Sequence, residues 1–234
     1  MSQLLLISSS RVHPTGFLEH CREAIARHFT GCKEVLFIPY ALADHDKYEA
    51  IVQNAFAPIG IPIRSIHHAA DPISQIRSAT GFFTGGGNTF RLLKTLYDLE
   101  LMEPLKQQIQ QTGIPYMGSS AGTNLAGPTV RTTNDMPIVE PPTFEALNLV
   151  PFQLNPHYQD ADPNSTHKGE TRAERLGEYL EENTTPVVAI REGSWLEVSN
   201  DQCQLCGTTG MVLFKRDQQP MEIGPTADLT FLMN

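Results

Sequence analysis

Apolar positions in the first half of the chain fall into short continuous runs, separated by longer stretches in which apolar residues recur at helical spacing. The apolar runs predict five strands, at 4–7, 34–38, 61–66, 81–84 and 114–117. The intervening stretches predict helices at 16–28, 47–56, 73–78 and 89–110, the last of them broken once. Because strands and helices alternate in this order, we predict an α/β fold with a mostly parallel, doubly wound sheet and helices on both faces. Ligands of such sheets bind at the carboxyl ends of the strands.

The second half of the chain is less regular. It predicts a strand at 152–155, a charged helix at 170–182, and three short strands at 187–190, 195–198 and 211–214. Turn residues separate these later strands, which indicates antiparallel hairpins that close the sheet edge toward the C-terminus. No internal repeat or long linker divides the sequence, so we expect one domain over residues 1–234.

Composition narrows the classes of function. With 40% hydrophobic residues, 234 residues are enough for one sizeable core, and the 17 basic and 26 acidic residues give a net charge of −9. This charge, without a basic cluster, argues against nucleic-acid and membrane partners. The apolar run at 4–7 is too short for a signal or spanning segment, and four cysteines are too few for a disulfide scaffold, so we expect a cytoplasmic protein. Cys203 and Cys206 form a lone C-x-x-C pair among turn residues, where a zinc or redox role is disfavoured.

Small residues gather where the predicted strand at 114–117 gives way to a helix. The pentapeptide 118–122, Gly-Ser-Ser-Ala-Gly, fits the G-x-S-x-G pattern with Ser120 in the middle. A nucleophile on such a sharp turn has a strained backbone, and its neighbours two positions away must be small. The amide of Ala121 would then lie at a helix N-terminus and stabilise negative charge. The alternative is a simple tight turn or a phosphate-binding nest.

A second glycine cluster, "FFTGGGNTF", ends another predicted strand. Its backbone amides can approach a ligand closely, and we hypothesise that an amide of Gly86, Gly87 or Asn88 completes an oxyanion hole with Ala121. The alternative is phosphate binding, although the segment matches neither the dinucleotide fingerprint nor the P-loop.

A nucleophilic serine needs a base, usually a histidine, oriented by a carboxylate. Among eight histidines, His157 in "FQLNPHY" follows a predicted strand and would lie at its carboxyl end, whereas His67 and His68 have no acid at a suggestive position. A hydrogen-bonded loop residue is the alternative for His157. Asp135 and Glu192 both border strand-like runs and are candidates for the acid, and either could be a surface carboxylate.

Several longer strings are distinctive: "GGGNTFRLLK", "GSSAGTNLAGPTVRTTNDMPIV", "LNPHY" with "HKGETR", and "REGSW". With them the chain resembles the peptidase E family of bacterial α-aspartyl dipeptidases, from the first strand to about residue 214. The resemblance implies a fold like class I glutamine amidotransferases and a serine peptidase that cleaves dipeptides beginning with aspartate. It implies Ser120 as nucleophile and His157 as base, with the acid at Asp135 or Glu192. We favour Glu192, and Asp135 could instead bind the substrate's ammonium group.

The same resemblance limits the reactions and the substrate-binding residues that we expect. Amidotransferases have a cysteine nucleophile and an acid close after the histidine, whereas 35 positions separate His157 from Glu192, so amidotransferase chemistry is not implied. A cation must pair with the substrate's aspartate side chain, and Arg131 and Arg172 are the candidates, followed by Lys168. Surface pairing with neighbouring glutamates is the alternative for Arg172.

These features predict a small-molecule substrate, an Asp-Xaa dipeptide, and neither a metal nor another cofactor. We expect a monomer or homodimer. The alternatives are a related serine hydrolase, such as an esterase, acyltransferase or cyanophycinase-like peptidase, or a non-catalytic, flavodoxin-like phosphate-binding module.

Overall fold

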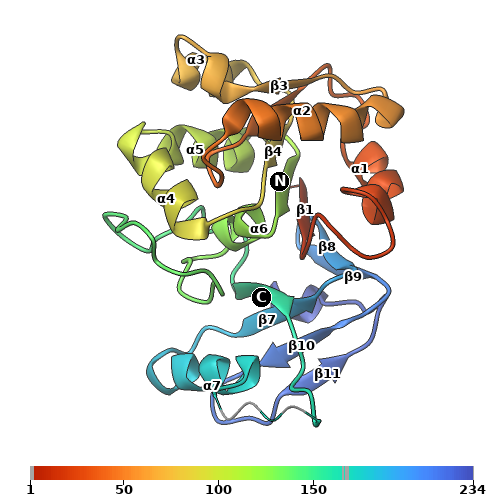
Figure 1. The fold of residues 1–234 in the computed structure, drawn as a ribbon, viewed down its shortest axis with the longest axis vertical. Coiled ribbons are helices and arrows are strands. Elements are labelled where there is room, and N and C mark those ends of the chain that lie inside the picture. Colours follow the sequence, from red (N-terminus) through yellow and green to blue (C-terminus); the bar gives the residue numbers. More distant parts are fainter. Residues whose placement is uncertain (1–2, 165, 167–168, 234) are drawn as a thin grey trace.

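The computed structural model describes residues 3–164, 166 and 169–233, which form two β-sheets with helices packed against them (Figure 1). The larger sheet has seven strands in the order β3-β2-β4-β5-β1-β8-β9. Five of these strands are parallel: β1 (Gln3–Ile7), β2 (Val35–Ile38), β3 (Ile63–Ser65), β4 (Phe82–Thr84) and β5 (Tyr116–Ser119). The hairpin of β8 (Ser194–Ser199) and β9 (Gln202–Gly207) adds antiparallel strands at the edge next to β1. The predicted mostly parallel sheet with antiparallel C-terminal hairpins is therefore confirmed.

Helices cover both faces of the parallel part of this sheet, as a doubly wound fold requires. One face carries α1 (Arg22–His28) and α2 (His45–Phe56). The other carries α3 (Pro72–Ser78), α4 (Thr89–Asp98), α5 (Met102–Thr112) and α6 (Ala121–Ala126). Single 3₁₀ turns lie at Glu19–Cys21 (η1), Ala57–Ile59 (η2), Ile66–His68 (η3) and Thr230–Leu232 (η4).

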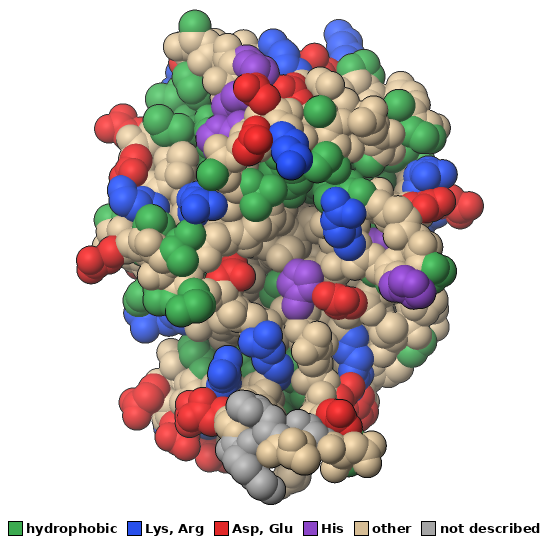
Figure 2. Space-filling view, viewed as in Figure 1, with side chains coloured by type: hydrophobic (Ala, Val, Ile, Leu, Met, Phe, Trp, Pro, Cys, Tyr) green, Lys and Arg blue, Asp and Glu red, His purple; other side chains and the backbone are tan. Residues whose placement is uncertain are grey.

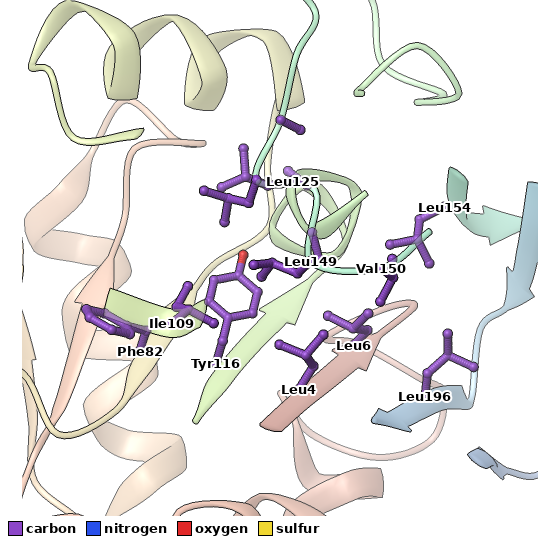
Figure 3. Close-up of a cluster of buried hydrophobic side chains, with 14 of the residues drawn as sticks. Leu4, Leu6, Phe82, Ile109, Tyr116, Leu125, Leu149, Val150, Leu154 and Leu196 are labelled. Carbon is purple, nitrogen blue, oxygen red and sulfur yellow. The ribbon is translucent and has the colours of Figure 1, made fainter. Parts of the chain in front are cut away.

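The core follows from the alternation of side chains along each strand. On β1, Leu4 and Leu6 point into the cluster beneath α4, α5 and α6, whereas Leu5 and Ile7 point toward α1 and α2. Figure 3 shows the first of these clusters, in which the β1 leucines meet Tyr116 of β5. Because every β1 residue from Leu4 onward is buried, the strand reads as a continuous apolar run rather than as an alternating one.

The smaller sheet has four strands in the order β11-β10-β7-β6 and lies below the larger one in Figure 1. Its strands are β6 (Gln153–Tyr158), β7 (Val187–Arg191), β10 (Met211–Phe214) and β11 (Met221–Ile223), of which β6 and β7 are parallel. Helix α7 (Arg172–Glu182) covers the outer face, and the inner-face residues Leu154 and Ile190 join the same core cluster as Leu4 and Leu6. This continuous core fits the single domain that we expect over 1–234, which stays a prediction.

Three local features differ from the sequence-based expectation. The helix predicted to begin at residue 16 begins as an α-helix only at Arg22, because Leu18 has a left-handed backbone (φ 58°). The segment containing Cys203 and Cys206 is strand β9 rather than a turn, and residues three apart on a strand point to opposite faces. Strand β11 and the separate smaller sheet were not predicted.

Candidate active site

Ser120 lies at the junction of β5 and α6 in a conformation that non-glycine residues rarely adopt, with φ 54° and ψ −109°. Such a conformation costs about 1–3 kcal/mol and persists only where the surroundings hold it. Here the Ser120 amide donates to the Ile7 carbonyl (3.0 Å), and the Ser120 carbonyl accepts from the Asn124 amide (2.9 Å). The hydroxyl is thereby held at the carboxyl ends of the central strands, as the sequence predicts.

The glycines two positions either side of Ser120 have no room for a side chain. A Cβ at Gly118 would lie 2.4 Å from the Gly122 carbonyl oxygen, and a Cβ at Gly122 would lie 2.1 Å from the Thr84 carbonyl oxygen. From the second glycine cluster, a Cβ at Gly86 would lie 3.0 Å from the Cβ of Ser120. The two glycine-rich loops therefore meet at this serine, and their glycines are a steric requirement.

His157 belongs to the other sheet, where a bulge in β6 gives it a positive φ of 57°. Its Nε2 lies 2.8 Å from Ser120 Oγ, close enough to accept the hydroxyl proton. The main chain of His157 is fixed by Ser8, whose hydroxyl accepts from the His157 amide (2.9 Å) and donates to the Ile190 carbonyl (2.8 Å). Sequence reasoning missed Ser8, although a polar run directly after the first buried strand marks a carboxyl end where ligands bind.

Glu192 completes a chain of three groups. It lies in the tight turn between β7 and β8, and its Oε1 is 2.6 Å from His157 Nδ1. The turn is held by Thr209, whose hydroxyl donates to the Glu192 carbonyl (2.7 Å). Asp135 lies elsewhere: its Oδ2 accepts from the Thr89 amide (2.7 Å) at the beginning of α4. Of the two candidate acids, the geometry joins Glu192 and not Asp135 to the imidazole.

The four amides that are candidates for the oxyanion hole, those of Gly86, Gly87, Asn88 and Ala121, differ in their contacts. The Gly86 amide is hydrogen-bonded to the Tyr48 side chain. The Asn88 amide donates to the Ala41 carbonyl (2.9 Å), so its inclusion was wrong: this amide is already used, and the Asn88 side chain caps α4. Gly87 has φ 139°, and a Cβ there would lie 2.5 Å from the same Ala41 oxygen. Within the described part of the chain, no hydrogen bond is made by the amides of Gly87 and Ala121. These two amides remain the candidates for binding an oxyanion.

Within the described part of the chain, the side chain of Arg172, unlike that of Arg131, is connected by hydrogen bonds to the strand that carries His157. Its Nη1 donates to Asn134 Oδ1 (2.8 Å), and Asn134 Nδ2 donates to the Pro156 carbonyl (2.8 Å). Burial, followed by the charge of Arg175, lowers the pKa of Arg172, while Asp135 opposes the shift. The alternative, surface pairing of Arg172 with neighbouring glutamates, is not found among the described residues: Glu170 pairs with Arg175 (3.6 Å), and Glu174 caps its own helix.

Arg131 instead stacks over the ring of Phe144, 5.0 Å from its centroid, on an exposed loop. Lys168 lies outside the described residues. A hollow occupies the middle of the face drawn in Figure 2, with histidine and acidic side chains at its lower border. A separate cavity of about 550 Å³, lined by Arg27, His28 and Glu197, lies at the amino end of β1 and contains none of the predicted site residues.

A hydroxyl, an imidazole and a carboxylate in this order can carry out nucleophilic acyl transfer, in which the imidazole accepts the hydroxyl proton and the carboxylate orients the imidazole. The order along the chain is serine, histidine, acid. In the described residues, no helix combines the length and apolar character needed to cross a bilayer.

Comparisons with known proteins identify the family. Residues 4–206 match the sequence profile of Peptidase family S51. The chain is 52% identical to "Peptidase E" of Streptomyces coelicolor, over 99% of this chain and 95% of that protein. It is 49% identical to the "Probable alpha-aspartyl dipeptidase" of Drosophila melanogaster, over 98% of this chain and 97% of that protein.

Solved structures share the fold at lower sequence identity. The crystal structure of a peptidase from an acI-B1 Actinobacterium superposes with a TM-score of 0.71 at 16% identity, over 98% of this chain and 96% of that one. A crystal structure from Listeria monocytogenes EGD-e superposes with a TM-score of 0.68 at 21% identity, over 89% of this chain and 100% of that one.

Proposed function

The chain belongs to peptidase family S51, and on that premise we propose that it is a serine-type dipeptidase that hydrolyses dipeptides with an N-terminal aspartate. Relatives of about 50% identity over nearly the whole chain carry the names peptidase E and alpha-aspartyl dipeptidase. The observation that carries the proposal for this chain is the unbroken series Ser120, His157 and Glu192, with contacts of 2.8 Å and 2.6 Å.

The reaction begins when Ser120 Oγ attacks the peptide carbonyl and His157 Nε2 takes the hydroxyl proton. The carbonyl oxygen, now negative, accepts hydrogen bonds from the amides of Gly87 and Ala121. His157 then donates its proton to the leaving amine, and the aspartyl group remains as an ester on Ser120. Water, deprotonated by His157, then attacks the ester carbonyl. The bond to Ser120 Oγ breaks, aspartate is released, and His157 returns the proton to Ser120 Oγ. Glu192 keeps the imidazole in the tautomer that these transfers require.

Selectivity for an N-terminal aspartate requires a positively charged protein group that binds its side-chain carboxylate and a negatively charged one that binds its ammonium group. We assign its side-chain carboxylate to Arg172 and its ammonium group to Asp135. The two residues are close enough for the Asp135 charge to act on the pKa of Arg172. A planar guanidinium suits a carboxylate, because two parallel hydrogen bonds can form.

Two measurements test the proposal. Ser120→Ala should fold normally and lose turnover of Asp-Leu, and a serine-directed phosphonate should label the wild type at Ser120 only. Turnover near the wild-type rate in Ser120→Ala would remove the nucleophile assignment. Hydrolysis of long-chain acyl esters in preference to Asp-Leu would favour an esterase or acyltransferase instead.

The charge assignment has its own matched controls. Arg172→Gln should lose the preference for Asp-Leu over Asn-Leu, whereas Arg131→Gln, on the exposed loop, should retain it. If Arg131→Gln alone loses the preference, Arg131 rather than Arg172 binds the carboxylate of the substrate's aspartate side chain. We also propose that the protein is cytoplasmic and is a monomer or homodimer. Cell fractionation tests the location, and gel filtration tests the oligomeric state.

A further inference from the structure

A group of metal-ligating side chains lies apart from the candidate active site, where the first turn of α2 meets the 3₁₀ turn η3. Asp46 and Glu49 come from α2, and His67 and His68 come from η3. One ligand atom from each of the four residues lies within 4.8 Å of the others. Figure 2 shows histidine and acidic side chains gathered at the top of the view, over α2 and the β3–α3 connection.

We propose that Asp46, Glu49, His67 and His68 bind one Zn²⁺ ion, which links α2 to η3. The separations between ligand atoms suit a tetrahedral ion: Asp46 Oδ1 lies 2.9 Å from His67 Nε2 and 3.7 Å from His68 Nε2, and Glu49 Oε2 lies 2.8 Å from His68 Nε2. Four ligands at about 2.0–2.1 Å from zinc are separated by about 3.3 Å, so small shifts of side chains suffice.

The surrounding residues already orient two of the ligands. His67 Nδ1 lies 2.6 Å from Ser65 Oγ, and this contact turns Nε2 toward the carboxylates. The Glu49 carboxylate is almost buried, and its Oε1 accepts from the Ser65 amide (3.0 Å) and Gln53 Nε2 (3.2 Å), which leaves Oε2 facing His68. Hydrogen bonds of this kind, from groups behind the ligands, are typical of protein metal sites.

The composition of the cluster suits one divalent cation. The rings of His67 and His68 lie side by side, 3.8 Å apart. Two carboxylates balance the charge of one Zn²⁺, and two imidazole nitrogens complete four ligands. Imidazole nitrogen suits zinc, whereas Mg²⁺ and Ca²⁺ prefer sites made of oxygen ligands. Four protein ligands also make a closed, structural site rather than a catalytic one.

Isothermal titration of the EDTA-treated full chain with ZnCl₂ tests the proposal independently of dipeptidase activity. We expect one Zn²⁺ per chain and no comparable binding of Mg²⁺. His68→Gln and Asp46→Asn change exposed side chains and should keep the fold, checked by thermal unfolding, but should abolish stoichiometric binding. Ser65→Ala, which removes only the group behind His67, should weaken binding by about 10–100-fold.

Two controls keep the result decisive. His45→Gln changes a neighbouring ring, 5.3 Å from that of His67, that is not a proposed ligand, and binding should be unchanged. His157→Gln removes the imidazole of the candidate active site and should also leave binding unchanged. Failure of the wild type to bind zinc stoichiometrically would overturn the proposal. So would binding that survives in a His67→Gln/His68→Gln double variant or disappears in His157→Gln.

Discussion

Glu192→Gln, compared with Asp135→Asn, tests which carboxylate supports the imidazole. The glutamine is isosteric, so it keeps the side chain near His157 Nδ1 but removes the negative charge that stabilises the imidazolium formed during turnover. Two unit charges about 4 Å apart attract by about 4 kcal/mol at an effective dielectric constant of 20 and by about 1 kcal/mol in water. At about 1.4 kcal/mol for each tenfold change in rate, this range corresponds to about a 5-fold to a 1,000-fold loss.

The exposure of the pair decides where in this range the effect falls. The side chains of Glu192 and His157 are 43% and 34% exposed, so solvent screens part of the charge until substrate covers the site. We expect kcat for Asp-Leu to fall by about 100-fold, with KM nearly unchanged and the free energy of unfolding changed by less than about 1 kcal/mol.

Asp135→Asn should behave in the opposite way. Asp135 accepts from the Thr89 amide and, on our assignment, binds the substrate's ammonium group, so its loss should raise KM more than it lowers kcat. Steady-state kinetics of both variants, with urea unfolding as the control for stability, separates the two roles. A Glu192→Gln variant with wild-type kcat, alongside an Asp135→Asn variant with a 100-fold lower kcat, would refute this reasoning.

Three further predictions concern groups that support the site and the fold. Gly122→Ala would place a Cβ 2.1 Å from the Thr84 carbonyl oxygen. We expect urea unfolding to show about 1–3 kcal/mol of destabilisation, and kcat to fall about 100-fold because Ser120 is displaced. The control Gly177→Ala, in open space on α7, should leave stability unchanged or raise it. Ser8→Ala should lower kcat with little effect on KM, because the His157 amide and the Ile190 carbonyl lose a shared buried partner; an unchanged kcat would show that Ser8 does not position the base. Burial lowers the pKa of His28 to about 4, so the unfolded chain binds the extra proton between about pH 6.5 and pH 4, and stability should fall by about 2 kcal/mol from pH 7 to pH 4.5. Denaturant unfolding of His28→Gln, which cannot titrate, should show a correspondingly smaller loss, and equal losses in both proteins would contradict the assignment.

The strands of the parallel sheet could be predicted because their sequences are locally informative. Runs such as 35–38 and 82–84 are buried on both faces and therefore continuously apolar, and the break in the helix at 89–110 coincides with Glu100, whose φ is 57°. The smaller sheet could not be predicted in the same way. Strands β7 and β10 are short, buried apolar runs like β2 of the larger sheet. Which sheet a strand joins therefore depends on packing between distant residues, such as that of Leu154 and Ile190 in one cluster with the β1 leucines.

In the candidate site, too, features set by neighbouring residues could be predicted, whereas features set by contacts between distant residues could not. Ser120 could be proposed from the sequence because the steric requirement of a sharp turn is local. It is visible as small residues at the five positions 118–122. The choice between Asp135 and Glu192 depends on where two loops lie in space, and no spacing rule fixes that. Asn88 was included wrongly because a donor to Ala41 leaves no mark in the sequence. His67 and His68 likewise have no acid at a suggestive position in the sequence, yet α2 brings Asp46 and Glu49 to them.

The proposed nucleophile and base belong to different sheets: Ser120 follows β5, whereas His157 lies on β6 and Glu192 lies where the chain crosses from one sheet to the other. Turnover therefore depends on the relative position of the two sheets. A displacement of about one ångström between them separates the reacting atoms but leaves each sheet intact. Heating or a substitution in the shared core should extinguish hydrolysis before secondary structure is lost.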